Sequence, residues 1–156
     1  NIGHDRFENV TNEYNFHLAG RISNIIWCDL NNDGYLDFIC GDKLGPLYIQ
    51  MNNGFGKFEN VRSKTGIPDS LIGYNPALAD VDNDGDLDLF LYGINNPIHY
   101  FENTGIKPQT GLPWFMNKDE MSPQLTTRFD FFTHAMRFSD YDNDGDLDLF
   151  MADRVS

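Results

Sequence analysis

The sequence predicts an all-β fold of β-propeller blades, each made of four antiparallel strands, and three observations lead to this prediction. The tetrapeptide Phe-Glu-Asn-Val occurs at residues 7–10 and again 51 residues later, at 58–61. An acidic segment at 29–37 recurs with the same offset at 80–88, and once more at 140–148. The segments that follow these acidic loops are apolar on both faces. Small sheets that are buried on both faces and repeat at such intervals are typical of propeller blades.

Each repeat contains four expected strands. The first precedes the acidic loop and the second follows it, while glycine and proline residues separate the second from the third. Asn53-Gly54 predicts a tight hairpin between the third and fourth strands. The expected strands, in chain order, are residues 7–10, 25–28, 36–40, 47–51, 58–61, 76–79, 87–92, 98–102 and 147–151.

The repeats divide the whole chain, residues 1–156, into about two and a half blades of a larger propeller. Residues 1–24 would hold the last strand of a preceding blade and a connection. Two blades with acidic loops follow at 25–61 and 76–121, and 135–156 would form the first two strands of another. Because propellers close with more blades than this, we expect further chain or a partner to complete the ring and to cover its exposed edges.

Spacing between the landmarks also locates an insertion. The second and third acidic segments are 60 residues apart rather than 51, and six of the extra residues fall between Gly105 and Phe115. We therefore expect a long turn between the third and fourth strands of the second blade. Trp114 in this turn is either a packed aromatic residue or an exposed contact.

The charge of the chain is strongly acidic and is concentrated in the loops. Asp and Glu number 24 against 11 Lys and Arg, which gives a formal net charge of −13. Such a chain should repel nucleic acid and anionic membranes, and its apolar runs are too short to span a bilayer. Thirteen of the 24 acidic residues lie in the three loops. Cation binding therefore explains the acidity better than a uniformly solvated surface does.

The three loops share the spacing Asp-x-Asp/Asn-x-Asp-Gly-x-x-Asp. Ca²⁺ takes six to eight oxygen ligands at about 2.3–2.6 Å, and a curled loop can direct its alternate side chains inward. Glycine at position 6 permits the sharp turn, and position 7 can offer its backbone carbonyl. The predicted ligands of the three Ca²⁺ ions are Asp29, Asn31, Asp33, Tyr35 (carbonyl) and Asp37; Asp80, Asp82, Asp84, Asp86 (carbonyl) and Asp88; and Asp140, Asp142, Asp144, Asp146 (carbonyl) and Asp148.

Two other interpretations of the loops are less consistent with the sequence. An EF-hand needs an acidic residue at position 12 and flanking helices, but Cys40, Leu91 and Met151 occupy that position between strand-like segments. Acidic surface turns would not repeat the same ligand spacing three times. We expect structural Ca²⁺ that holds each hairpin together, with the weakest binding in the first loop, which has fewer carboxylates.

The acidic loops, the Leu-Asp-Leu-Phe that follows two of them, and the glycine-rich turn at 52–61 resemble the FG-GAP/VCBS repeat family, whose relatives include the propellers of integrin α subunits. This resemblance implies seven or eight blades, Ca²⁺ in the loops and an extracellular location. It also implies that ligands engage the face opposite the calcium loops, formed by residues 42–44, 62–76, 94–96 and 122–134. The departures from the family pattern are Asn31, Tyr35 and the long turn of the second blade.

The function predicted from these features is a non-enzymatic, calcium-stabilised adhesion, scaffold or protein-binding module, secreted or at a cell surface. Its partners would be a protein or a glycan, and neither nucleic acid nor direct membrane insertion. Two alternatives stay open: the propeller part of a polysaccharide-degrading enzyme, and a propeller lectin. The four histidines are scattered, at positions 4, 17, 99 and 134, so zinc chemistry is not predicted. A bridge between Cys28 and Cys40 also stays open.

Overall fold

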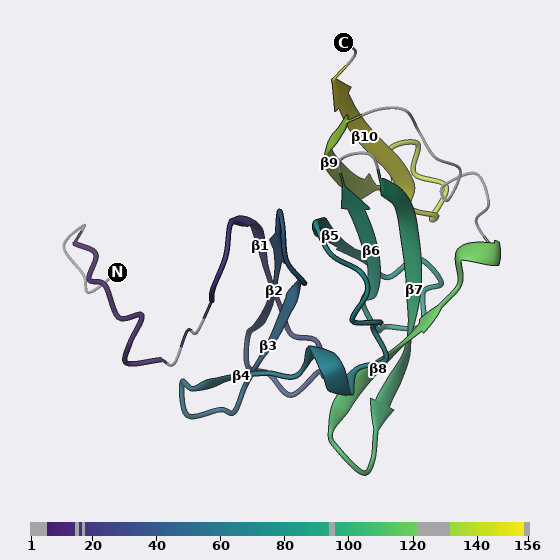
Figure 1. Cartoon of the computed structure of the whole chain (residues 1–156). Helices are drawn as coiled ribbons and strands as arrows, with labels where there is room; N and C mark the ends of the chain where they lie inside the picture. Colours follow the sequence, from purple (N-terminus) through teal and green to yellow (C-terminus); the bar gives the residue numbers. More distant parts are fainter. Residues whose placement is uncertain (1–5, 15, 17, 94–95, 122–131, 155–156) are drawn as a thin grey trace.

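A computed structural model describes residues 6–14, 16, 18–93, 96–121 and 132–154. The described residues form three antiparallel sheets of four, four and two strands that follow one another along the chain (Figure 1). This architecture confirms the all-β prediction and is that of partial propeller blades. Within the described residues, no helix is long and apolar enough to cross a membrane.

Each sheet pairs its strands in chain order, as a meander does. The first sheet contains β1 (Ile22–Cys28), β2 (Asp37–Asp42), β3 (Tyr48–Asn52) and β4 (Phe58–Asn60). The second contains β5 (Tyr74–Ala79), β6 (Asp88–Gly93), β7 (Asn96–Lys107) and β8 (Leu112–Asn117). The third pairs β9 (Phe132–Ser139) with β10 (Asp148–Arg154), and two short 3₁₀ helices, η1 (Arg62–Lys64) and η2 (Asp119–Met121), follow β4 and β8.

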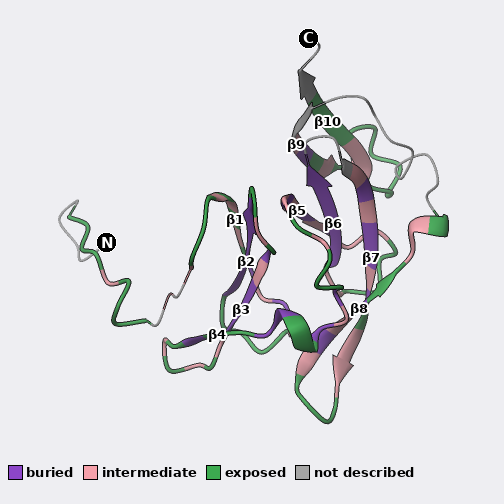
Figure 2. Cartoon of the chain, in the orientation of Figure 1, coloured by how far each residue is buried: buried purple, intermediate pink, exposed green. Residues whose placement is uncertain are grey.

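The core lies between the sheets, so each central strand is buried on both faces. All six residues of β2 and all six of β6 are buried (Figure 2). Leu89 and Leu91 of β6 pack with Ile39 and Ile49 of the first sheet. On its other face, β6 presents aromatic residues to the third sheet, where Phe90 lies 4.6 Å from Phe138 between ring centroids. The apolar strands therefore reflect blade-on-blade packing, as the sequence predicted.

Two expectations about strands need correction. Residues 7–10 are not a strand: they pair with no strand among the described residues, and Phe7 is 83% exposed. A β-strand needs a hydrogen-bonding partner along its edge, and residues 7–10 have no such partner strand in the described part of the chain. The insertion in the second blade is also not a loop, because β7 and β8 extend through it and pair as far as Lys107 and Leu112.

The two cysteines lie on opposite faces of the first sheet. Cys28 packs in the core between the first two sheets, whereas Cys40 packs with Phe38 and Phe58 on the other face. Both are free thiols. Burial raises the pKa of Cys28 to about 12 and that of Cys40 to about 11. They are therefore core residues, and the possibility of a bridge between them is not realised.

Candidate metal centre

The three acidic loops connect equivalent strands, β1 to β2, β5 to β6 and β9 to β10. They share two left-handed backbone positions. The glycine at position 6 has φ of 87°, 93° and 97° in the three loops, and the asparagine at position 4 has φ of 56°, 59° and 59°. Glycine and asparagine are the residues that adopt this conformation at least cost. The sequence therefore specifies the same curl three times.

Within each loop, the first aspartate closes the curl. The Asp80 carboxylate accepts hydrogen bonds from the backbone N–H of Asp84 at 3.1 Å and of Gly85 at 3.0 Å. Asp29 does the same in the first loop at 3.0 and 2.8 Å, and Asp140 in the third at 3.1 Å for both bonds. Carboxylates that accept backbone N–H groups are held firmly, so position 1 is oriented before any ligand arrives.

The last aspartate of the first two loops is buried and joins the loop to the sheet. Asp88 accepts the backbone N–H of Val81 at 3.2 Å and that of Asn103, on β7, at 2.8 Å. Asp37 accepts the equivalent donors, Leu30 and Asn52, at 3.0 and 2.8 Å. Both side chains belong to residues that are 0% exposed. Position 9 thus anchors the loop to the third strand of its sheet.

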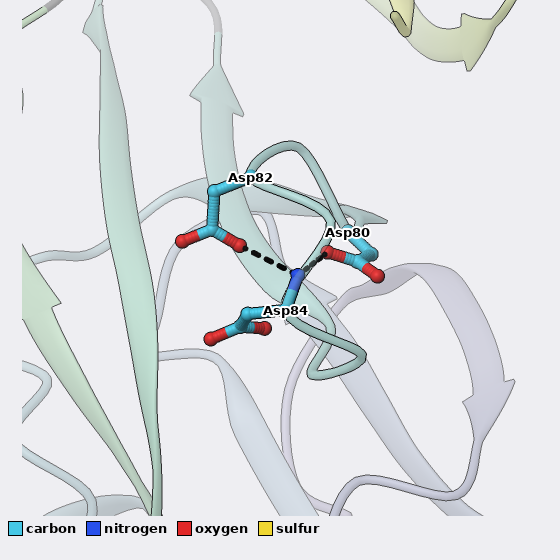
Figure 3. Close-up of side chains that lie close together, drawn as sticks. All are labelled: Asp80, Asp82 and Asp84. Atoms are coloured by element: carbon cyan, nitrogen blue, oxygen red, sulfur yellow. Dashed lines mark hydrogen bonds between the residues drawn. The ribbon is translucent and has the colours of Figure 1, made fainter. Parts of the chain in front are cut away.

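The carboxylates converge in the second loop. One oxygen from each of Asp80, Asp82 and Asp84 lies within 4.8 Å of the others, and all three point toward one region of the loop (Figure 3). The Asp84 backbone N–H lies between the first two carboxylates, at 3.1 Å from Asp80 and 3.3 Å from Asp82. The Asp86 carboxylate is not part of this group and accepts a hydrogen bond from Asn32 at 3.0 Å.

The other two loops differ in which predicted residues they bring together. In the third loop the converging carboxylates are Asp140, Asp142 and Asp148, without Asp144. The first loop forms no such group of three among the described residues. There, Asn31 donates to Asp33 at 2.9 Å. The amide oxygen of Asn31 is buried and accepts no hydrogen bond from the described residues.

This unpaired oxygen tests whether the loop suits a hard cation. A buried acceptor without a partner costs free energy unless a donor or a cation satisfies it. Position 3 is a predicted calcium ligand in all three loops, and an amide oxygen is a ligand that Ca²⁺ accepts. The donor set of the three loops consists of oxygen atoms only, which fits Ca²⁺ and argues against softer metals.

Comparison with known proteins supports the repeat. Residues 29–91 match the FG-GAP-like repeat family. The chain is also 28% identical over 120 residues to cartilage acidic protein 1 of Xenopus tropicalis. That alignment covers 76% of this chain but only 18% of the relative, so the chain spans less than a fifth of that protein.

In the two loops within the matched segment 29–91, burial shifts the pKa of the aspartate at position 9. Burial raises the pKa of Asp88 to about 6, and the charges of Asp82 and Asp84 add to the shift, although the bonds from Asn103 and Val81 oppose it. Burial also raises the pKa of Asp37, at position 9 of the first loop. Like-charged neighbours and desolvation both disfavour the ionised form. A cation in the loop would favour it.

Sequence reasoning missed two asparagines that support the first two acidic loops. Asn52 and Asn103 each donate a side-chain N–H to the carbonyl at position 8 of the loop, at 3.2 and 3.3 Å. Their side-chain oxygens accept the N–H of Gly54 and Gly105 at 3.1 and 3.2 Å. The signal was present as the repeated Asn-x-Gly, which we interpreted only as a hairpin. The asparagine also links that hairpin to the acidic loop.

The face opposite the loops contains a second polar cluster. His99 lies 2.6 Å from Asp119 through Nδ1 and 3.0 Å from the Tyr74 hydroxyl through Nε2. Hydrogen bonds from Asn117, His99 and the Tyr100 N–H outweigh the effect of burial and lower the pKa of Asp119. His99 of β7 therefore joins Tyr74 of β5 to Asp119 of η2.

The remaining predicted features are in part structural and in part outside the described residues. Trp114 is half-buried, with the Lys107 ammonium 2.9 Å from its ring centroid. Asp42, on the expected ligand face, is buried and accepts the N–H of Leu44 and Arg21 at 3.0 and 3.1 Å. Most of the segments 94–96 and 122–134 expected on that face lies outside the described residues.

Proposed function

We propose that the three acidic loops bind Ca²⁺ and that the ions stabilise the strand hairpins of the blades. The observation that carries this proposal is the convergence of three carboxylates in the second loop and again in the third. Carboxylates at such separations repel one another unless a cation or a proton neutralises them. Ca²⁺ supplies two positive charges and accepts six to eight oxygens, so it turns the repulsion into a link between the strands.

The residues that would hold the ions are those at positions 1, 3, 5, 7 and 9 of each loop, and their roles differ. Positions 1, 3 and 5 face the ion, position 7 offers its carbonyl, and position 9 ties the ion to the third strand. Three ions would bring the formal net charge from −13 to about −7. Affinities of about 10⁻⁴–10⁻³ M, typical of extracellular modules, would be enough for a structural role.

We further propose that the protein is a non-enzymatic binding or scaffold module outside the cell, whose partner is a protein or a glycan. The match of residues 29–91 to the FG-GAP-like repeat family supports this proposal, and so does the similarity to cartilage acidic protein 1. The acidic composition argues against nucleic acid as the partner. Further blades, from the same chain or from another, would complete the ring.

One feature favours the lectin alternative. A groove of about 480 Å³ is lined by four aromatic residues together with Glu8, Val10, Asn52 and Gly56. Trp27, one of the four, is 53% exposed, and its ring centroid lies 4.9 Å from that of Phe38. Aromatic faces beside polar groups suit sugar rings. A glycan array with the full chain tests this alternative, and binding that persists in Trp27→Ala would contradict a role for the groove.

Calorimetric titration with Ca²⁺ and thermal unfolding in the presence and absence of a chelator test the calcium proposal. We expect Ca²⁺ to raise the melting temperature, and Mg²⁺ to do so much less. Asp84→Asn should weaken binding about tenfold or more, since one charged ligand is lost. Glu120→Gln makes the same charge change on an exposed residue of η2 and should have no effect. Identical melting with and without the chelator would reject the structural role.

A further inference from the structure

The first and second acidic loops contact each other through their side chains. The Asn32 side-chain N–H donates to the Asp86 carboxylate at 3.0 Å, across 54 positions of sequence. Asn32 is position 4 of the first loop and Asp86 is position 7 of the second. Neither side chain was predicted to face an ion, so this contact has no role in the calcium sites as described above.

We propose that this hydrogen bond couples the two calcium sites, so that Ca²⁺ in the second loop increases the affinity of the first. This inference rests on the proposed calcium function. It adds that the loop with fewer carboxylates depends on its neighbour. In thermodynamic terms the coupling is reciprocal, and the first ion must favour the second by the same factor.

The position of each partner explains how the coupling would act. Asn32 lies between the predicted ligands Asn31 and Asp33, at the left-handed turn of its loop. Asp86 uses its carboxylate for Asn32, while its backbone N–H donates to Asp84 at 2.8 Å and its carbonyl is the predicted ligand. An ion that fixes the second loop therefore also fixes the acceptor for Asn32. The first ion to bind therefore orders part of both loops, and the second ion loses less conformational entropy when it binds. This difference produces positive cooperativity.

The first two sheets are held together closely enough for one loop to influence the other through this contact. The Phe115 N–H of the second sheet donates to the Thr65 carbonyl at 2.8 Å, next to the core that both sheets share. On the inner strands, the Asn24 amide donates to the Pro76 carbonyl at 3.3 Å. Because these bonds and the core fix the two sheets against each other, movement of one loop changes the geometry of the contact rather than shifting the whole blade.

The second and third loops provide a natural comparison. Their equivalent residues are Asn83 and Asp146, and within the described residues no hydrogen bond joins these two side chains. The Asp146 backbone N–H donates to Asp144 at 3.0 Å, as the Asp86 N–H does to Asp84, so at this position the two loops differ only in the side-chain contact. The loops are otherwise alike in their left-handed asparagine and glycine. We therefore expect coupling between the first and second sites and independence of the third.

The test follows each site separately in the full chain by nuclear magnetic resonance. The backbone amides of Gly34, Gly85 and Gly145 report the three loops during a Ca²⁺ titration. Asp84→Ala disables the second loop, and it should weaken Ca²⁺ binding at the first about fivefold, the low end of typical coupling between sites, because the bond is exposed to solvent. Binding at the third loop should not change.

Asn32→Gly removes the amide and keeps the left-handed backbone, and Asn83→Gly is the matched control. In Asn32→Gly, disabling the second loop should no longer alter the first, whereas in Asn83→Gly the fivefold effect should remain. An unchanged first-loop affinity in Asp84→Ala would overturn the coupling but leave the calcium function intact. A fivefold effect that survives Asn32→Gly would show that this bond does not carry it. Amides that do not respond to Ca²⁺ would reject the calcium function itself.

Discussion

The first and second acidic loops have the same backbone but a different arrangement of charge. In both, the first aspartate closes the curl and the last one is buried against two backbone N–H groups. Only the second brings three carboxylates together, because the first has Asn31 where the second has Asp82. The comparison teaches that hydrogen bonds to the backbone N–H groups set the conformation of the loop. The repulsion among its carboxylates, which a cation would relieve, depends separately on which residues occupy the ligand positions.

The largest effect should come from removing the buried aspartate at position 9, which joins each of the first two loops to its sheet. Asp88→Ala leaves the N–H groups of Val81 and Asn103 without their acceptor, and a buried unpaired donor costs about 1–3 kcal/mol. We expect the free energy of unfolding to fall by about 3 kcal/mol. Asp37→Ala should cost a similar amount, because it also loses two donors. Urea unfolding in the presence of a chelator measures the loss of stability in both variants. A large difference between the two losses would show that the buried aspartate does not have the same role in the two loops.

The second effect concerns pH in the absence of calcium. Because the pKa of Asp88 is raised to about 6 in the folded protein, the folded state holds a proton that the unfolded state releases above its ordinary pKa. Stability should therefore fall as pH rises from 4 to 7, by about 2 kcal/mol after allowance for solvent screening.

Saturating Ca²⁺ should oppose this trend, since the ion binds the charged form and is displaced by protons at low pH. Chemical unfolding across the pH range, with chelator and with Ca²⁺, measures the contribution. Asp88→Asn removes the titrating group and should flatten the slope seen in chelator. An unchanged slope in that variant would assign the pH dependence to other groups.

The third effect exchanges the charges of the two loops. Asn31→Asp in the first loop adds the missing carboxylate, and we expect its calcium affinity to rise about fivefold, a gain of roughly 1 kcal/mol from one more charged ligand. Without calcium, the same variant should be less stable because the acids repel one another. Asp82→Asn in the second loop should do the reverse. Calorimetric Ca²⁺ titration of both variants, together with thermal unfolding in chelator, tests this prediction. Affinities or melting temperatures that change in the same direction in both variants would contradict it.

The smallest effect should come from the supporting asparagines. Asn103→Ala removes the side-chain bonds to the Leu87 carbonyl and the Gly105 N–H but leaves its backbone bond to Asp88. We expect a loss of about 1 kcal/mol, since each net hydrogen bond contributes about 0.5–1.5 kcal/mol and these are partly exposed. Asn52→Ala is the equivalent change in the first blade. A greater loss on the longer β7–β8 hairpin than on β3–β4 would show that the insertion depends on this asparagine.

Much of the fold could be predicted because it rests on local patterns. The asparagine and glycine of each acidic loop suit a left-handed backbone, and the strands around them appear close to the expected positions. Residues 7–10 show the limit of such reasoning. They repeat the Phe-Glu-Asn-Val of residues 58–61, yet pair with no strand in the described structure, because pairing depends on a neighbouring strand and not on the segment itself.

The candidate site also has one part that the sequence determines and another that only the tertiary structure decides. Its ligand positions follow from spacing within nine residues, so the sequence alone determined where an ion would be expected. Which carboxylates converge is a tertiary outcome: Asp148 joins the group in the third loop, whereas Asp84 does so in the second. The contact of Asn32 with Asp86 also depends on how two sheets pack. Side chains 54 positions apart meet only when the core between the blades has brought them together.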